Sequence, residues 1–195
     1  MSLTEGGLTN SQKRVIETLR QIYNQYRSAL LNRKYYGHRL ETAQQFNLGF
    51  ECVIAIGATG SGIAGWALWK GTGIGELTWA FIAGAASLFA ILKPILNVPK
   101  RVERMSKLWV AHSRQYNDLK RLVDKVRRMQ NVDAEIERTF DEICSKTSEL
   151  DSLDDPKPSK RLIKRYSAEV RREIPAHTLW MPDYYFSENQ DKAAS

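Results

Sequence analysis

Two long apolar segments lie in the middle of this 195-residue chain, and polar sequence flanks them on both sides. No charged residue occurs from Cys52 to Trp69, a run of 18, or from Leu77 to Leu92, a run of 16. A bilayer core ~30 Å thick is crossed by ~20 apolar residues, and a helix pairs every backbone polar group within itself. We therefore predict a transmembrane helical hairpin with spans at about 46–69 and 77–98 and a Gly-rich turn at 70–76. A buried hairpin in a soluble helical bundle is the alternative.

Amphipathic helix patterns lie on both sides of the apolar segments. Before them, apolar residues recur every three or four positions from Val15 to Leu40, and only Arg33 interrupts this stripe. After them, a second stripe keeps the same spacing, which is typical of a heptad seam. Its positions are Val102, Met105, Trp109, His112, Tyr116, Leu119, Val123 and Val126, with Leu108 and Leu122 widening the face. We predict that antiparallel cytoplasmic helices continue the hairpin and bury Trp109 and Tyr116 between them.

The C-terminal third contains one more predicted helix and then a tail of different composition. The helix runs from Val132 to Leu150, and its apolar face holds Ile136, Phe140 and Ile143. The tail's aromatic residues could pack on the bundle, lie at the membrane surface or bind a partner; they are Trp180, Tyr184, Tyr185 and Phe186. The predicted organisation is a flexible N-terminus at 1–9, an all-α two-transmembrane domain at 10–150, a polar linker with two prolines at 151–160 and a basic, aromatic tail at 161–195.

Basic residues are concentrated beside the apolar segments, within a chain of formal net charge +7. Residues 26–45 contain four Lys or Arg and residues 99–118 contain five, whereas the turn contains only Lys70. By the positive-inside rule, both arms and both termini face the cytoplasm. Three tryptophans beside the turn match an aromatic belt at the outer interface: Trp66, Trp69 and Trp79.

Small residues are dense in both predicted spans and indicate close helix packing. The candidate packing positions are Gly57, Ser61, Gly62, Gly65, Gly84 and Ser87. Small side chains let helix backbones approach one another in lipid, where no hydrophobic force drives association. One face could serve the contact within the hairpin, and the surplus predicts contacts between copies in a homo-oligomer. The alternative is that all of these residues serve one intramolecular seam.

Glu51 and Lys93 are charged residues at the margins of the two spans. Measured from a turn centre near Gly73, they lie 22 residues before and 20 residues after it. At 1.5 Å per residue, their depths in the membrane then differ by only ~3 Å. We predict an ion pair that fixes the register of the spans. The alternative is that Lys93 reaches the lipid phosphates while Glu51 faces water.

The sequence contains no recognisable catalytic or cofactor-binding pattern. The three histidines stand apart from one another, and the cysteines, Cys52 and Cys144, form no ligand or redox motif. The glycine-rich stretch lies within and just after an apolar segment, which does not suit a phosphate-binding loop. The basic run 160–172 could bind acidic lipid or nucleic acid, and a solvated helix face is the alternative. We expect no enzyme activity, no cofactor and no metal.

Three stretches together give the chain a family resemblance. They are RKYYGHRLE at Arg33–Glu41, IAIGATGSGIAGW at Ile54–Trp66, and a long helix that begins KRVERMSKLW at Lys100. Over roughly residues 10–150 this layout resembles the SLATT family of two-transmembrane effectors from prokaryotic conflict systems.

The resemblance implies an oligomeric inner-membrane effector of antiphage defence that forms or gates a pore and ends the growth of an infected cell. It also implies membrane lipid and a defence-system sensor or nucleotide-signalling protein as partners, since this chain has no recognisable sensor domain. The alternative function is a non-conducting membrane scaffold that recruits a cytoplasmic partner through its helical arm and tail.

Overall fold

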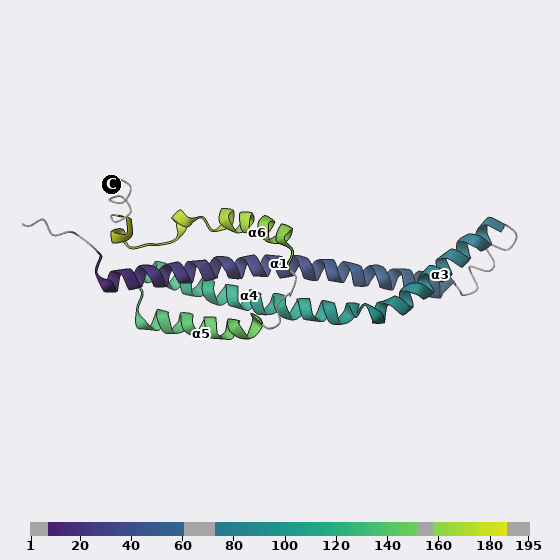
Figure 1. Ribbon diagram of the computed structural model, residues 1–195, viewed down its shortest axis with the longest axis horizontal. Coiled ribbons are helices and arrows are strands. Elements are labelled where there is room, and N and C mark those ends of the chain that lie inside the picture. The colour runs from purple at the N-terminus through teal and green to yellow at the C-terminus, as the bar shows by residue number, and fades with distance from the viewer. Residues whose placement is uncertain (1–7, 61–72, 152–157, 187–195) are drawn as a thin grey trace, which may run out of the picture. The chain divides into compact units, whose positions relative to one another are not determined.

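The computed structural model describes residues 8–60, 73–151 and 158–186, and within them the chain is entirely helical. Its elements are α1 (Asn10–Gly60), α3 (Gly73–Ile95), α4 (Val98–Met129), α5 (Ala134–Asp151), α6 (Lys160–Glu173) and a short 3-10 helix, η1 (Ala176–Thr178) (Figure 1). The described part of the chain contains no β-strand. The predicted all-α class is therefore confirmed.

Local hydrogen bonds and backbone conformation explain where several helices begin and end. Helix α1 starts with a capping box, in which the Gln12 N–H donates to Thr9 Oγ1 at 3.3 Å and the Thr9 N–H donates to Gln12 Oε1 at 2.8 Å. At the start of α5, Asp133 Oδ1 accepts the Ile136 N–H at 2.8 Å. Asn97, between α3 and α4, and Gln130, after α4, have φ values of 48°, a left-handed conformation that interrupts a helix.

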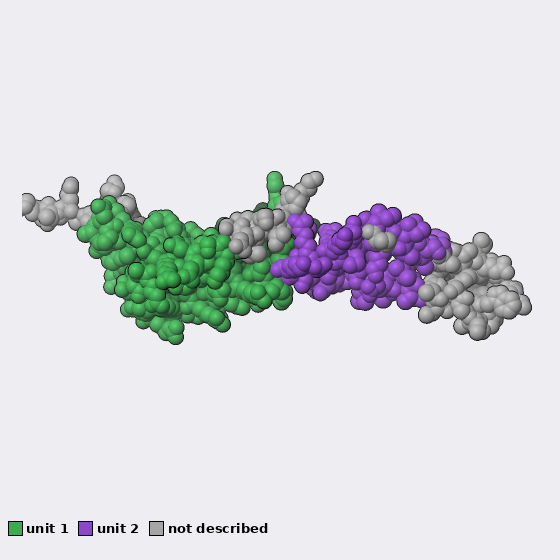
Figure 2. Space-filling model, turned by 90° about the horizontal axis from the view of Figure 1, so that it is seen from below, with its two compact units in different colours: residues 1–35, 108–195 green, residues 36–107 purple. Residues whose placement is uncertain are grey.

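The chain divides into two compact units, which are coloured separately in Figure 2. The first unit combines residues 1–35 with residues 108–195, and the second consists of residues 36–107. Helices α1 and α4 each contribute residues to both units. The C-terminal segment therefore belongs to the same unit as the N-terminal part of α1.

The core of the first unit is a cluster of buried apolar side chains from α1, α4, α5 and α6. The members from α1 are Leu19, Ile22, Tyr23, Tyr26, Ala29 and Leu30. Those from α4 and α5 are Leu119, Leu122, Val123, Val126, Ile136, Phe140 and Ile143, and Val170, Ile174 and Leu179 complete the cluster. The predicted third helix and its apolar face are therefore confirmed, since Ile136, Phe140 and Ile143 all lie in this core.

In the second unit, α3 packs against the C-terminal part of α1. The rings of Phe50 and Phe89 meet edge to face with their centroids 5.1 Å apart. Ala43 of α1, Ala86 of α3 and Val98 of α4 are buried in the same unit. These three side chains therefore form part of the packed interior of the second unit.

Within residues 8–60, 73–151 and 158–186, no helix meets the combined length and apolarity needed to cross a membrane. Residues 61–69 of the first predicted span, and the part of the predicted turn up to residue 72, lie outside the described residues. Residues 73–76, which we predicted as the end of the turn, already belong to α3, so this part of the prediction is wrong.

Candidate functional site

Glu51 and Lys93, the predicted ion pair, are brought together in the second unit. Lys93 Nζ of α3 donates to Glu51 Oε1 of α1 at 3.0 Å. The Asn47 side-chain amide, one helical turn before Glu51, donates to the same carboxylate oxygen at 2.9 Å. Two donors on one carboxylate fix its rotamer, and the pair joins α1 to α3. The structure therefore contains the contact that the depth argument predicts.

The candidate small-residue positions fall into two groups. Gly57 lies in α1, and Gly84 and Ser87 lie in α3, whereas Ser61, Gly62 and Gly65 lie outside the described residues. Gly84 is exposed, and a Cβ built on it would have no heavy atom within 4 Å. Among the described residues, the space beside Gly84 is therefore open. Both interpretations of the small residues, one seam within a hairpin and contacts between copies, stay predictions.

The buried face of α4 shares only part of its residues with the predicted seam. Of the eight predicted positions, five are buried, namely Met105, His112, Leu119, Val123 and Val126. Val102 and Tyr116 are half-buried. Trp109, which we predicted to be buried, is 36% exposed, and its neighbour Leu108 is only 1% exposed. The prediction for Trp109 is therefore wrong, because α4 buries the adjacent Leu108 in its place.

Gln115 is a buried residue of α4 that the sequence pattern missed. It lies three residues after His112, and its Oε1 is 3.4 Å from His112 Nδ1. The two polar side chains face each other inside an otherwise apolar helix face, which reduces the free-energy penalty of burying them. Their i, i+3 spacing is the only sequence signal that could have identified the pair.

Tyr26 of α1 and Tyr116 of α4 form an aromatic contact in the first unit. Their rings are stacked, with centroids 5.3 Å apart and planes 11° from parallel, and the hydroxyl oxygens are 3.4 Å apart. The Arg33 guanidinium lies 5.1 Å from the centroid of the Tyr116 ring. Burial, followed by the hydrogen bond to Tyr116, raises the pKa of Tyr26 above its ordinary range. This hydroxyl therefore stays protonated and neutral at physiological pH.

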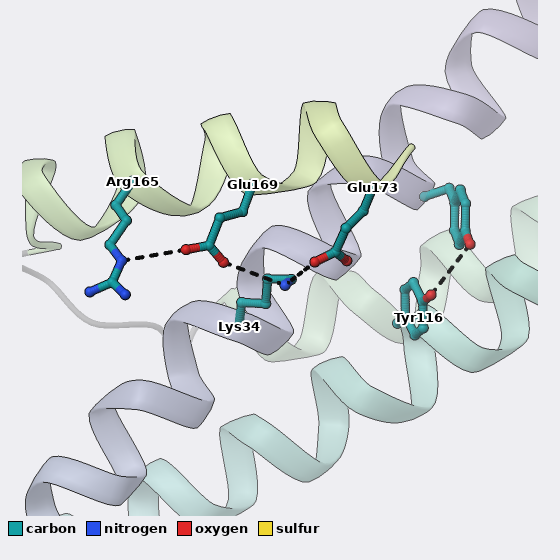
Figure 3. A network of polar contacts seen from close by, with 6 residues as sticks. Lys34, Tyr116, Arg165, Glu169 and Glu173 are labelled. Carbon is teal, nitrogen blue, oxygen red and sulfur yellow. Dashed lines mark hydrogen bonds and ion pairs between the residues drawn. The ribbon is translucent and has the colours of Figure 1, made fainter. Parts of the chain in front are cut away.

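Helix α6 is attached to α1 by an ion-pair network centred on Lys34. Figure 3 shows Lys34 between Glu169 and Glu173 of α6, with Arg165 paired to Glu169. The Lys34 Nζ–Glu169 Oε2 distance is 3.5 Å, and Glu173 is the closer partner. The hydrogen bond to Glu173 makes the largest contribution to raising the pKa of Lys34. The network therefore favours the charged lysine and holds α6 against α1.

The segment after α6 is also held on the first unit. Arg27 Nη2 donates to the Ile174 carbonyl at 3.0 Å, and the Tyr23 hydroxyl donates to the Trp180 carbonyl at 2.6 Å. Trp180 is half-buried against the core. Of the three alternatives for the tail aromatics, the structure places Trp180 on the bundle. Tyr184 and Tyr185 are half-buried, and Phe186 is exposed.

Two adjoining grooves in the second unit were not anticipated from the sequence. The larger, of about 480 Å³, is lined by Phe46, Gly49, Val53 and Phe89 among others. The smaller, of about 240 Å³, has arginine side chains in its lining. No periodicity in the sequence marks these grooves.

No group of three or more His, Cys, Asp or Glu in the described segments is arranged to hold a metal ion. Burial, and then the Asp141 carboxylate, raise the pKa of the Cys144 thiol, which disfavours the reactive thiolate.

Over its described residues the chain is an all-α protein of two helical units. Comparison with protein-family models, with curated proteins and with solved structures finds no match to this chain. The resemblance to the SLATT family therefore rests on the layout and residues of the chain itself.

Proposed function

We propose that the chain is a membrane effector that resembles the SLATT family. In this proposal, segments 46–69 and 77–98 enter the inner membrane of a prokaryotic cell, with both termini in the cytoplasm. Copies of the chain associate there and form or gate a pore. The chain acts without a cofactor and without enzyme activity, and a separate sensor protein supplies the trigger.

The exposed apolar surface of the second unit is the observation that carries the proposal. Eight large apolar side chains between residues 46 and 96 are more than half exposed: Phe46, Leu48, Ile56, Phe81, Leu88, Ile91, Ile95 and Leu96. Removing such a side chain from water contributes about 1.5–3 kcal/mol, so leaving them all in water is strongly unfavourable. All eight lie in the two segments that the charge pattern marks as spans, and lipid tails would cover them.

Two further observations support insertion and association. The Glu51–Lys93 pair compensates charge at the margin of both spans, where an unpaired charge is unfavourable. Gly84 has open space where a Cβ would lie, which would let a second copy approach the α3 backbone closely.

Membrane extraction and membrane potential, measured in the same bacterial cells, test the proposal. The full chain should resist extraction by alkaline carbonate, and its induction should collapse the potential reported by a voltage-sensitive dye. Complete extraction of the chain would refute insertion. Resistance to extraction with an unchanged potential and no growth defect would refute the pore and favour the non-conducting scaffold.

A further inference from the structure

The smaller groove of the second unit combines an apolar floor with two cationic side chains. It has a volume of about 240 Å³, and Arg39 of α1 and Arg101 of α4 both line it. The apolar part of its lining includes Phe46, Phe50, Leu96 and Val98. None of the described residues that line the groove is acidic, and the two guanidinium groups favour a negatively charged group there.

The larger groove extends this site along α1. The two grooves share Thr42, Phe46 and Phe50, and the larger one, of about 480 Å³, continues to Val53. Gly49 lines it, and a Cβ at this position would meet no heavy atom within 4 Å. The absence of a side chain at Gly49 therefore keeps the groove open. Together the grooves form an apolar path that begins at two arginines.

The position of the arginines along the chain matches the depth of lipid phosphates in the proposed membrane. Arg101 lies three residues beyond the second predicted span, and Arg39 lies seven residues before the first. At 1.5 Å per residue these offsets are ~5 Å and ~10 Å, and the headgroup layer outside the hydrocarbon is ~5–8 Å thick. The long arginine side chains cover the remaining difference.

We propose that this groove binds one anionic phospholipid from the cytoplasmic leaflet. Arg39 and Arg101 contact the phosphate, and an acyl chain lies in the apolar path past Phe46 and Gly49. Guanidinium groups match phosphate oxygens in charge and geometry, and basic pockets at the cytoplasmic face suit anionic headgroups. The inference rests on the proposed function, because it requires the second unit to lie in the membrane.

Lipid retention by the purified full chain tests the inference. The chain is delipidated in detergent, supplied with phosphatidylglycerol or phosphatidylcholine, and analysed by native mass spectrometry. Wild type should retain phosphatidylglycerol in preference to phosphatidylcholine. The double variant Arg39→Gln with Arg101→Gln should weaken phosphatidylglycerol binding about tenfold or more. The matched control, Arg121→Gln with Arg128→Gln, removes the same charge from exposed positions of the first unit and should bind as wild type does.

Gly49→Leu tests the apolar path separately, because it fills the groove and leaves both arginines in place. It should also weaken phosphatidylglycerol binding. Equal retention by the double variant and its control would overturn the inference, and so would full competition by inorganic phosphate, which would indicate an anion site without a lipid chain.

Carbonate extraction of the same variants separates the two possible failures. A wild-type chain that carbonate extracts fully from membranes refutes the proposed function. A chain that stays in the membrane, but whose variants all retain phosphatidylglycerol equally, refutes only the lipid site.

Discussion

Replacing Leu88 by Asp distinguishes a helix surface that faces lipid from one that faces water. Leu88 lies on α3 at the centre of segment 77–98 and is 55% exposed. In water, a polar substitution at such a site changes the free energy of unfolding by about 0.5 kcal/mol at most. At the centre of a membrane helix, Leu favours insertion by about 0.5 kcal/mol and Asp opposes it by about 3 kcal/mol. The expected change in insertion free energy is therefore about 3–4 kcal/mol, a factor of several hundred.

The assay is the fraction of full-length chain that resists carbonate extraction, compared between wild type, Leu88→Asp and a control. Met129→Asp is the matched control, because Met129 is 45% exposed on α4 and lies outside both predicted spans. We expect Leu88→Asp to lose most of the resistant fraction and Met129→Asp to keep it. If Leu88→Asp keeps the wild-type fraction, Leu88 does not face the hydrocarbon and the membrane interpretation of α3 is wrong.

Three further predictions test contacts that the structure describes. Glu51→Lys should lower the carbonate-resistant fraction, and adding Lys93→Glu should restore part of it; a double variant no better than Glu51→Lys would contradict the pairing. Leu119→Asp should destabilise the chain by about 3–5 kcal/mol in denaturant unfolding, because it leaves an unpaired charge in a fully buried site, whereas Asn117→Asp on the exposed side should change stability little. The pKa of Lys34 in the folded state is raised above its ordinary value of 10.5. The ion pairs of Lys34 therefore stabilise the fold below pH 10.5, and this stabilisation is lost as the pH rises through the folded-state pKa. The difference in Tm between wild type and Lys34→Met should therefore be present at pH 8 and shrink at more alkaline pH, and a constant difference would contradict this assignment.

The features that the sequence predicted well are those set by local geometry. The apolar face of α5 follows from the spacing of Ile136, Phe140 and Ile143 alone, since a helix repeats every 3.6 residues. The contact between Glu51 and Lys93 was predicted from the rise per residue, counted along each helix from an assumed turn centre near Gly73. In both cases the regular geometry of a helix, its repeat or its rise per residue, is enough to predict which residues lie together.

The docking of the C-terminal segment could not be predicted in the same way. The Tyr23 hydroxyl and the Trp180 carbonyl are 157 residues apart in the chain, and no periodicity connects them. Lys34 shows the same limitation, because its partners Glu169 and Glu173 lie on a helix that sequence alone could also leave in solvent. Aromatic composition indicated that the tail would contact something, but the identity of the contact depends on tertiary packing.

The incorrect prediction for Trp109 shows that a heptad pattern predicts a helix more reliably than it predicts which side chains of that helix are buried. Spacings of three and four residues fit two registers of α4, which share Met105 and Leu119 but differ in choosing Leu108 or Trp109. A helix with one partner needs only a narrow stripe, whereas the part of α4 in the first unit shares a core with α1 and α5. A wider face is then buried, and consecutive residues such as Leu122 and Val123 are both covered. The exposure of Trp109 beside buried Leu108 depends on which side of α4 its neighbours pack against, and periodicity does not encode that choice.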